Sequence, residues 1–156
     1  MKSGTELEAD LIVTATGLKM QLLGGMELYK DGVVISASDT HCYKGVMFSD
    51  IPNFAMTIGY TNASWTLKCD LSCTFVTRVL RHMSEHHYRS CAPRFDAQAL
   101  TSEPLLDFDA GYVKRALDIL PKQGSKVPWK VHQNYLRDLW MLKYSSLEDP
   151  YLEFLQ

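Results

Sequence analysis

The chain has 156 residues, 46% of them hydrophobic and 22% charged, and a formal net charge of −2. Such a chain can bury one core, and its composition is that of a globular protein rather than a disordered one. The charge gives no electrostatic basis for binding nucleic acid or an anionic membrane. The apolar runs are far shorter than a membrane span, and the first residues lack the pattern of a signal peptide. We therefore expect a cytoplasmic protein that binds neither nucleic acid nor a membrane.

The first predicted element is a strand over residues 6–14, because residues 11–13 form a run typical of a buried strand. The small residues after it let the backbone turn sharply and approach a ligand closely. In an open α/β sheet, nucleotides bind beyond the carboxyl ends of strands. Thr16 and Gly17 are therefore candidate cofactor-binding residues. The alternative is an ordinary strand end, since many buried strands that bind nothing also end in Thr-Gly.

A hairpin, a second strand and a long helix follow. Residues 26–36 predict the hairpin, because Asp31-Gly32 between two apolar strands favours a type I′ turn. Residues 54–60 predict a buried strand, and residues 64–86 predict a helix capped by Thr61 or Asn62. This helix has a broad apolar face, which we expect to be largely buried. Its main stripe, with Leu71, Phe75 and Val79 at its flank, consists of Trp65, Cys69, Cys73, Val76, Leu80 and Met83.

The junction between that strand and that helix, at residues 59–65, is a second candidate cofactor site. Backbone N–H groups without intrahelical partners gather at a helix N-terminus, and the helix dipole favours negative charge there. The alternative is an ordinary capped helix that contacts no ligand. The candidate cofactor-binding residues at this junction are Asn62, Ala63, Ser64 and Trp65.

The chain changes character after residue 90. Residues 91–110 contain two prolines and mixed polar residues, and predict an extended, wrapping segment. Residues 111–120 predict a short helix that stops at Pro121, which cannot continue the backbone hydrogen bonding. Residues 134–143 predict another helix. The tail from Ser145 is expected to be a loop that carries a last apolar cluster.

Metal and nucleophile chemistry finds little support in the sequence. The four cysteines show neither disulfide-framework nor zinc-finger spacing, and we expect them to be small core side chains. His82 and His86 share one helical face, but they lie on the opposite flank from Cys69 and Cys73. We therefore predict no metal site. No pair of carboxylates and no Ser–His–Asp or Cys–His arrangement stands out, so we assign no catalytic residue.

Four longer motifs carry a resemblance to a known family. They are YKGVMFSDIPN at residues 43–53, IGYTNASWTLK at 58–68, LPKQGS at 120–125 and QNYLRD at 133–138. Together with Ala15-Thr16-Gly17, they resemble the C-terminal third of bacterial FAD- and NADPH-dependent monooxygenases of the Baeyer–Villiger, ethionamide-activating type. The similarity extends from about Lys2 to Leu142 without a large gap.

The resemblance implies an α/β fold that is part of an FAD/NAD(P)-binding fold with two dinucleotide-binding domains. The expected parts are a short mixed β-sheet, one long helix and a helical C-terminal arm. Residues 1–90 would belong to the FAD- and NADP-binding domains, and residues 91–156 would form the wrapping arm. Residues 121–125 and the Trp129-Lys130 pair would be a solvated loop that packs this arm against the body. Their alternative role is to approach the NADP phosphates or the substrate.

The resemblance also implies a reaction. In such enzymes NADPH reduces FAD and O2 adds to give a C4a-peroxyflavin. One oxygen atom is then inserted into a ketone, or transferred to a sulfur or nitrogen atom of a small organic substrate. The helix end at residues 62–65 would face the pyrimidine side of the isoalloxazine ring. Thr16 and Gly17 would lie where the chain crosses from the NADPH domain back to the FAD domain.

Neither of the two Gly-x-Gly-x-x-Gly turns that hold FAD and NADPH occurs among the nine glycines. We therefore expect a fragment of such an enzyme that is inactive and binds neither cofactor by itself. Its strands would lack sheet neighbours, so we also expect it to be an oligomer. The alternative is a catalytically silent, stand-alone α+β domain that acts through protein–protein contacts.

Overall fold

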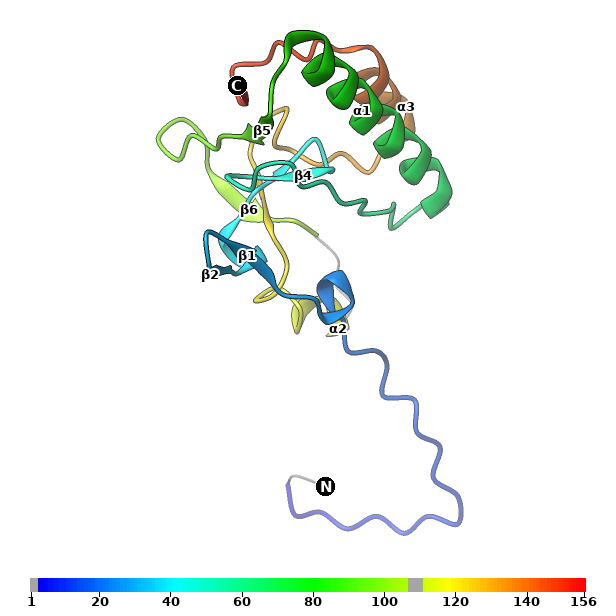
Figure 1. Cartoon of the computed structure of the whole chain (residues 1–156). Helices are drawn as coiled ribbons and strands as arrows, with labels where there is room; N and C mark the ends of the chain where they lie inside the picture. Colours follow the sequence, from blue (N-terminus) through cyan, green and yellow to red (C-terminus); the bar gives the residue numbers. More distant parts are fainter. Residues whose placement is uncertain (1–2, 107–110) are drawn as a thin grey trace.

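Residues 3–106 and 111–156 are described by a computed structural model, shown in Figure 1. The N-terminal segment, from residue 3 onward, extends away from the body of the molecule (Figure 1). The strand predicted at residues 6–14 is absent, and Leu11, Ile12 and Val13 are 81%, 79% and 79% exposed. A strand needs a hydrogen-bonded neighbour, and no other described residue pairs with this segment. The prediction of a strand was therefore wrong for this chain.

The predicted hairpin is confirmed. Strands β1 (Leu28–Lys30) and β2 (Val33–Ile35) pair antiparallel, with Leu28 opposite Ile35. Asp31 and Gly32 connect them with φ angles of 52° and 79°. Two positive φ angles in a two-residue loop are the signature of a type I′ turn, which matches the twist of the flanking strands. This hairpin is a purely local structure, which is why its sequence predicts it well.

The remaining strands are short and form three further antiparallel pairs. The pairs are β3 (Cys42–Tyr43) with β4 (Met47–Phe48), β5 (Ser90–Pro93) with β8 (Leu152–Leu155), and β6 (Ser102–Pro104) with β7 (Lys122–Gly124). One isolated parallel bridge joins His41 to Lys122. Strand β8 corrects the prediction of a C-terminal loop, because the tail adds to β5. Two 3-10 turns, η1 (Leu22–Gly25) and η2 (Ala37–Asp39), complete the first half.

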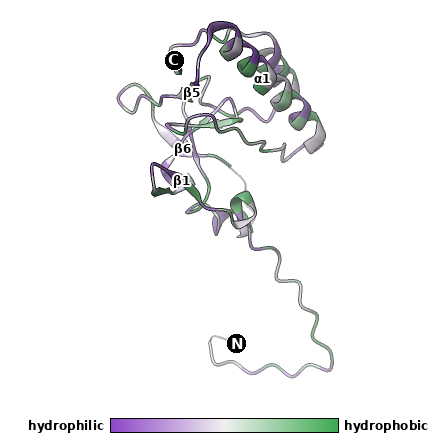
Figure 2. Ribbon diagram, viewed as in Figure 1, coloured by the Kyte–Doolittle hydropathy of each residue, from purple (hydrophilic) through white to green (hydrophobic). Residues whose placement is uncertain are grey.

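The long helix α1 (Trp65–His86) matches the predicted range. It ends at His87, whose left-handed φ of 59° stops the helix. The predicted apolar stripe is wrong, because Trp65 and Leu80 are 62% and 60% exposed. Figure 2 shows hydrophilic and hydrophobic residues interleaved along α1. The buried face is the one that flanks the predicted stripe. It consists of Leu71, Phe75 and Val79 together with two polar residues, Lys68 and Ser72.

Of the two helices predicted in the C-terminal arm, the first is shorter than predicted and the second is confirmed. Helix α2 covers only Gly111–Lys114, and the following residues form turns up to Leu120. The predicted helix at 134–143 is confirmed as α3 (Tyr135–Leu139), which continues into the π-helical turn η3 (Trp140–Tyr144). Asn134 caps α3, since its side-chain oxygen accepts the backbone N–H of Arg137 at 3.0 Å. In the second predicted strand, residues 54–60, only Ala55 forms a bridge, with Met47.

The main core joins the two halves of the chain around Trp129. This fully buried indole makes edge-on contacts with Tyr43 and Phe95 at centroid distances of 5.3 and 5.0 Å. The loop predicted at residues 121–125 is not solvated, because β7 forms there and Gln123 is only 5% exposed. The architecture is a small mix of short sheets and a few helices, as expected for the fold class. The division at residue 90 into two domains stays a prediction.

Candidate functional site

The junction at residues 59–65 connects an irregular half-buried segment to α1. Gly59 lies directly under the indole of Trp65: a Cβ built on Gly59 would lie 2.2 Å from that ring. Any larger residue at this position would displace the Trp65 ring, so glycine allows the close contact. The close contact also sets where the first turn of α1 begins relative to the preceding segment.

The start of α1 differs from the prediction. Its N-cap is Ser64 rather than Thr61 or Asn62, and the Ser64 side chain makes no capping hydrogen bond. The Ser64 hydroxyl pairs instead with that of Thr66 at 2.7 Å. The first turn carries no acidic residue. The helix therefore presents its N-terminal end without a neutralising side chain, which favours an anionic group there.

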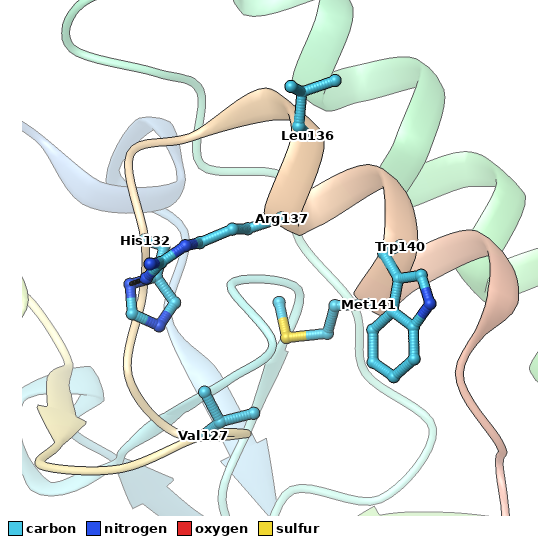
Figure 3. A pocket seen from close by; sticks show the side chains of 6 residues that line it. All are labelled: Val127, His132, Leu136, Arg137, Trp140 and Met141. Atoms are coloured by element: carbon cyan, nitrogen blue, oxygen red, sulfur yellow. Dashed lines mark hydrogen bonds between the residues drawn. The ribbon is translucent and has the colours of Figure 1, made fainter.

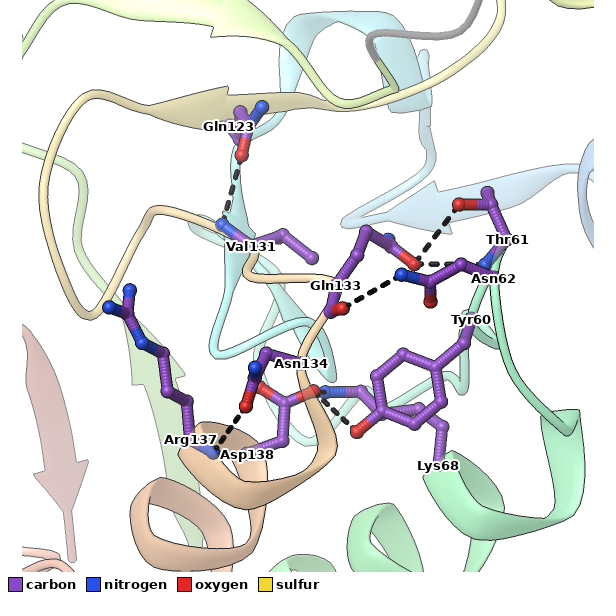
Figure 4. Close-up of polar contacts among 10 residues, drawn as sticks. All are labelled: Tyr60, Thr61, Asn62, Lys68, Gln123, Val131, Gln133, Asn134, Arg137 and Asp138. Carbon is purple, nitrogen blue, oxygen red and sulfur yellow. Dashed lines mark hydrogen bonds and ion pairs between the residues drawn. The ribbon is translucent and has the colours of Figure 1, made fainter.

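Thr61 and Asn62 bond to the C-terminal arm, as Figure 4 shows. The Gln133 side-chain oxygen accepts the backbone N–H of Thr61 at 2.9 Å and the Thr61 hydroxyl at 3.3 Å. The Asn62 amide donates to the backbone oxygen of Gln133 at 3.2 Å. Two residues predicted to cap a helix thus connect the junction to a segment more than seventy positions later.

A buried polar cluster lies below the same junction (Figure 4). One carboxylate oxygen of Asp138 accepts the Tyr60 hydroxyl at 2.7 Å and pairs with the Lys68 ammonium at 2.8 Å. The side chains of Lys68 and Asp138 are 2% and 1% exposed. Burial and the hydrogen bond to Asp138 raise the pKa of Tyr60, so its hydroxyl remains a donor at neutral pH. The second Asp138 oxygen has no partner among the residues that the structure describes.

The other predicted site residues, Thr16 and Gly17, lie in the extended N-terminal segment. They line a hollow of about 680 Å³ together with Lys19 and Arg115, and Gly17 has a φ of 79°. The residues of the 59–65 junction line none of this hollow. The structure therefore does not bring the two predicted cofactor segments together at one site. The hollow adds two cations that the sequence analysis did not single out.

A second hollow was missed by sequence reasoning. It has a volume of about 460 Å³ and lies beside α3 and η3, where Figure 3 shows the six side chains that line it. Leu136, Trp140 and Met141 supply apolar walls, and Arg137 and His132 supply the polar edge. Partial burial and the Arg137 guanidinium lower the pKa of His132. The one signal in the sequence was Leu136 and Trp140 at the helical spacing of four.

The four cysteines differ in burial. Cys42 and Cys91 are buried as predicted, and burial raises the pKa of each thiol to about 12. Cys69 is half-buried and Cys73 exposed, which corrects the expectation for these two. Within residues 3–106 and 111–156, no group of three or more metal-ligating side chains converges. No helix in these ranges has the length and apolarity to cross a membrane.

Comparison with known proteins reveals related sequences. The chain is 47% identical over 154 residues to the FAD-containing monooxygenase EthA of Mycolicibacterium smegmatis. This match covers 99% of the chain and 31% of EthA. It is 48% identical over 155 residues to the putative FAD-containing monooxygenase MymA of Mycobacterium tuberculosis, a match that covers 98% of the chain and 31% of MymA. The probable FAD-binding monooxygenase AlmA of an Acinetobacter species is 42% identical over 155 residues, with 99% and 31% covered. No family model and no solved structure matches.

These relatives agree with one another in kind and in extent. Each is named a monooxygenase that contains or binds FAD, and the chain spans about a third of its length. The match runs through all four sequence motifs, because it covers at least 98% of the chain. The resemblance to FAD-containing monooxygenases seen in the motifs is thereby confirmed, and nearly the whole chain is similar to about a third of each of these proteins.

Proposed function

We propose that the chain supplies the C-terminal part of an FAD- and NADPH-dependent monooxygenase of the Baeyer–Villiger type. Such an enzyme takes one oxygen atom from O2 and inserts it into a ketone, or oxidises a sulfur or nitrogen atom of a small organic substrate. The observation that carries this proposal is the 42–48% identity, over nearly the whole chain, to proteins named FAD-containing or FAD-binding monooxygenases.

The 59–65 junction suits a flavin. A bound flavin supplies the chemistry that transfers electrons from NADPH to O2, and its reduced form carries negative charge. The N-terminus of α1 would stabilise that charge through its backbone N–H groups and its dipole, since Ser64 does not cap it. Asn62, Ala63, Ser64 and Trp65 are all exposed there and would contact the flavin.

The N-terminal segment has a different proposed role. Thr16 and Gly17 would form the crossing between the NADPH and FAD domains, where small residues allow close approach to the cofactors. Their positions beside Lys19 and Arg115 support this, because two cations suit the phosphates of a dinucleotide. The apolar hollow at Leu136 and Trp140 would lie on the rim of the active site, in keeping with a small apolar substrate.

The chain by itself would bind neither FAD nor NADPH and would be inactive. Both dinucleotide-binding glycine turns are missing from its sequence, and these turns provide much of the grip on the pyrophosphate. Titration with FAD, followed by quenching of flavin fluorescence, tests this statement. We expect no saturation in the micromolar range, and a dissociation constant in the low micromolar range or tighter would contradict it.

A chimera tests the function itself. The matching third of the smegmatis EthA protein is replaced by this chain, and the unmodified parent serves as the control. We expect the chimera to purify with bound FAD, to oxidise NADPH and to oxygenate a simple ketone or thioether. A folded chimera without flavin, or one that reduces O2 but transfers oxygen to neither substrate class, would contradict the proposal.

A second candidate function is favoured by the exposed apolar run. Leu11, Ile12 and Val13 are about four-fifths exposed, which is unusual for three consecutive large side chains. We propose that they engage another protein surface, such as a second copy of the chain. Sedimentation at micromolar concentration is expected to show an oligomer. If the chain is a monomer, self-association through this run is excluded. If the chimera is also inactive, the monooxygenase function is excluded as well.

A further inference from the structure

In the motif at residues 133–138, the side chains of Gln133, Asn134 and Asp138 have no role in the proposed function, yet each accepts a hydrogen bond from another residue of the chain. Asn134 caps α3, and Asp138 and Gln133 reach back to the 59–65 junction. Figure 4 shows both side chains directed at residues that flank the start of α1. The motif therefore connects the arm to the predicted flavin contact at two separate points.

We infer that Gln133 and Asp138 are positioning residues that fix the backbone of the 59–65 junction from the C-terminal arm. The inference rests on the proposed function only in one respect, namely that this junction is the part that meets the flavin. The arm would then set the geometry of the cofactor contact without touching the cofactor itself.

Gln133 provides the first point of attachment. Three donors on two consecutive residues, Thr61 and Asn62, all end on Gln133. The strand β7 holds the start of this segment in turn, because the Gln123 side chain accepts the backbone N–H of Val131 at 2.9 Å. A hydrogen bond to a backbone N–H fixes the peptide plane directly, so the position of Thr61 follows that of Gln133.

Asp138 provides the second point. Its donors lie near the two ends of the junction, since Tyr60 is at its start and Lys68 is in the first turn of α1, just beyond its end. A buried ion pair often stabilises a fold no more than apolar residues of the same volume would. The orphaned second oxygen of Asp138 adds a desolvation penalty to that balance. Stability is thus a weak reason for this pair, whereas bracketing the junction gives it a clear geometric task.

Amide hydrogen exchange in this chain tests the inference with a matched pair of variants. Gln133→Met keeps the length of the side chain but removes the acceptor oxygen, and Gln133→Glu restores it. We expect exchange of the Thr61 backbone amide, which donates to Gln133 in the wild type, to become about tenfold faster in Gln133→Met, since a lost hydrogen bond of about 1.4 kcal/mol corresponds to that factor. Gln133→Glu should return to within about threefold of the wild type.

A positioning role predicts a local change in exchange, whereas a general loss of stability would speed exchange throughout the chain. Exchange in the β5–β8 pair and in the last turns of α1 should not change in Gln133→Met, because these elements do not contact Gln133. Tyr60→Phe, which removes one hydrogen bond to Asp138 and keeps the ring, should also speed exchange of the Thr61 amide without changing these distant elements. Unchanged exchange at the junction, or equal acceleration throughout the chain, would overturn the inference.

The experiment uses no flavin, so it separates this inference from the proposed function. Selective loosening of the junction supports the positioning role even if the chimera proves inactive. An active, flavin-loaded chimera leaves the proposed function standing even if the junction does not respond to Gln133→Met. In that case the positioning role alone is overturned.

Discussion

The two segments expected to meet the cofactor differ in what holds them. Residues 14–17 follow an apolar run that no described residue covers, and they lie at the base of the extended segment, where Thr16 and Gly17 line a hollow beside Arg115. Residues 59–65 also follow an apolar run and end in small and polar side chains, yet the arm holds them by side-chain hydrogen bonds. Two segments with similar local sequences are thus held differently, because only the second of them, residues 59–65, has hydrogen-bond partners among the described residues that are distant in the sequence.

The largest expected effect concerns Asp138. Asp138→Ala leaves the Lys68 ammonium buried without its counter-charge, which costs about 3–5 kcal/mol of unfolding free energy. Urea denaturation followed by circular dichroism measures it. Asp10→Ala, an acidic residue in the extended segment, is the matched control and should change stability by less than about 0.5 kcal/mol. Equal effects of the two substitutions would remove the contrast between arm and extended segment.

A pair of tryptophans tests the core of the arm. Trp129→Ala empties the centre of the main core and should destabilise the chain by about 3–5 kcal/mol. Trp140→Ala removes a side chain that is 65% exposed in the apolar hollow, and should cost less than about 1 kcal/mol. Thermal unfolding of both variants gives the comparison. A larger loss in Trp140→Ala would show that the hollow is closed in solution.

The attachment of β7 to the body predicts a pH dependence. His41 stacks on Phe95 at 3.5 Å beside Lys122 of β7, and burial together with the Lys122 charge lowers its pKa. The unfolded chain then binds a proton more readily, so stability is full above about pH 6.5 and falls as the pH drops below it. In His41→Gln, the unfolding free energy should fall less between about pH 7 and pH 5.

The smallest expected effect lies in the extended segment. Ile12→Ser should change the unfolding free energy by less than about 0.5 kcal/mol, because that side chain makes no buried contact. The same substitution should weaken any self-association seen by sedimentation, since it removes an exposed apolar side chain. A destabilisation of more than about 1 kcal/mol at low concentration would show that the segment folds onto the body.

Local signals explain most of what the sequence predicted correctly. The Asp31-Gly32 turn and the range of α1 depend on neighbouring residues alone, and both are confirmed. The start of the helix predicted at residues 134–143 is also set locally, by the Asn134 cap. The two hollows gave almost no signal, because they are formed by side chains that come together only in the folded chain.

The failures share a non-local cause. Strand β8 exists because Leu152–Leu155 pairs with β5, some sixty residues earlier. The buried face of α1 was misjudged because Lys68 turns inward to Asp138, a partner that hydropathy cannot reveal. Thr61 and Asn62 are residue types that favour helix caps, but in the structure both donate hydrogen bonds to Gln133 instead. Thr16, Gly17 and residues 62–65 were chosen largely through the family resemblance, and their contact with a cofactor stays a prediction.

The central claim is that the N-terminus of α1 faces the flavin. Ser64→Asp and Ser64→Asn in the flavin-loaded chimera test it most directly, because both side chains are favoured at an N-cap and differ only in charge. A negative charge beside the flavin disfavours its reduced, anionic form. The midpoint potential should therefore be lower in Ser64→Asp than in Ser64→Asn by about 30 mV, equivalent to about 1.4 kcal/mol for two electrons. Identical potentials in the two variants would contradict the claim.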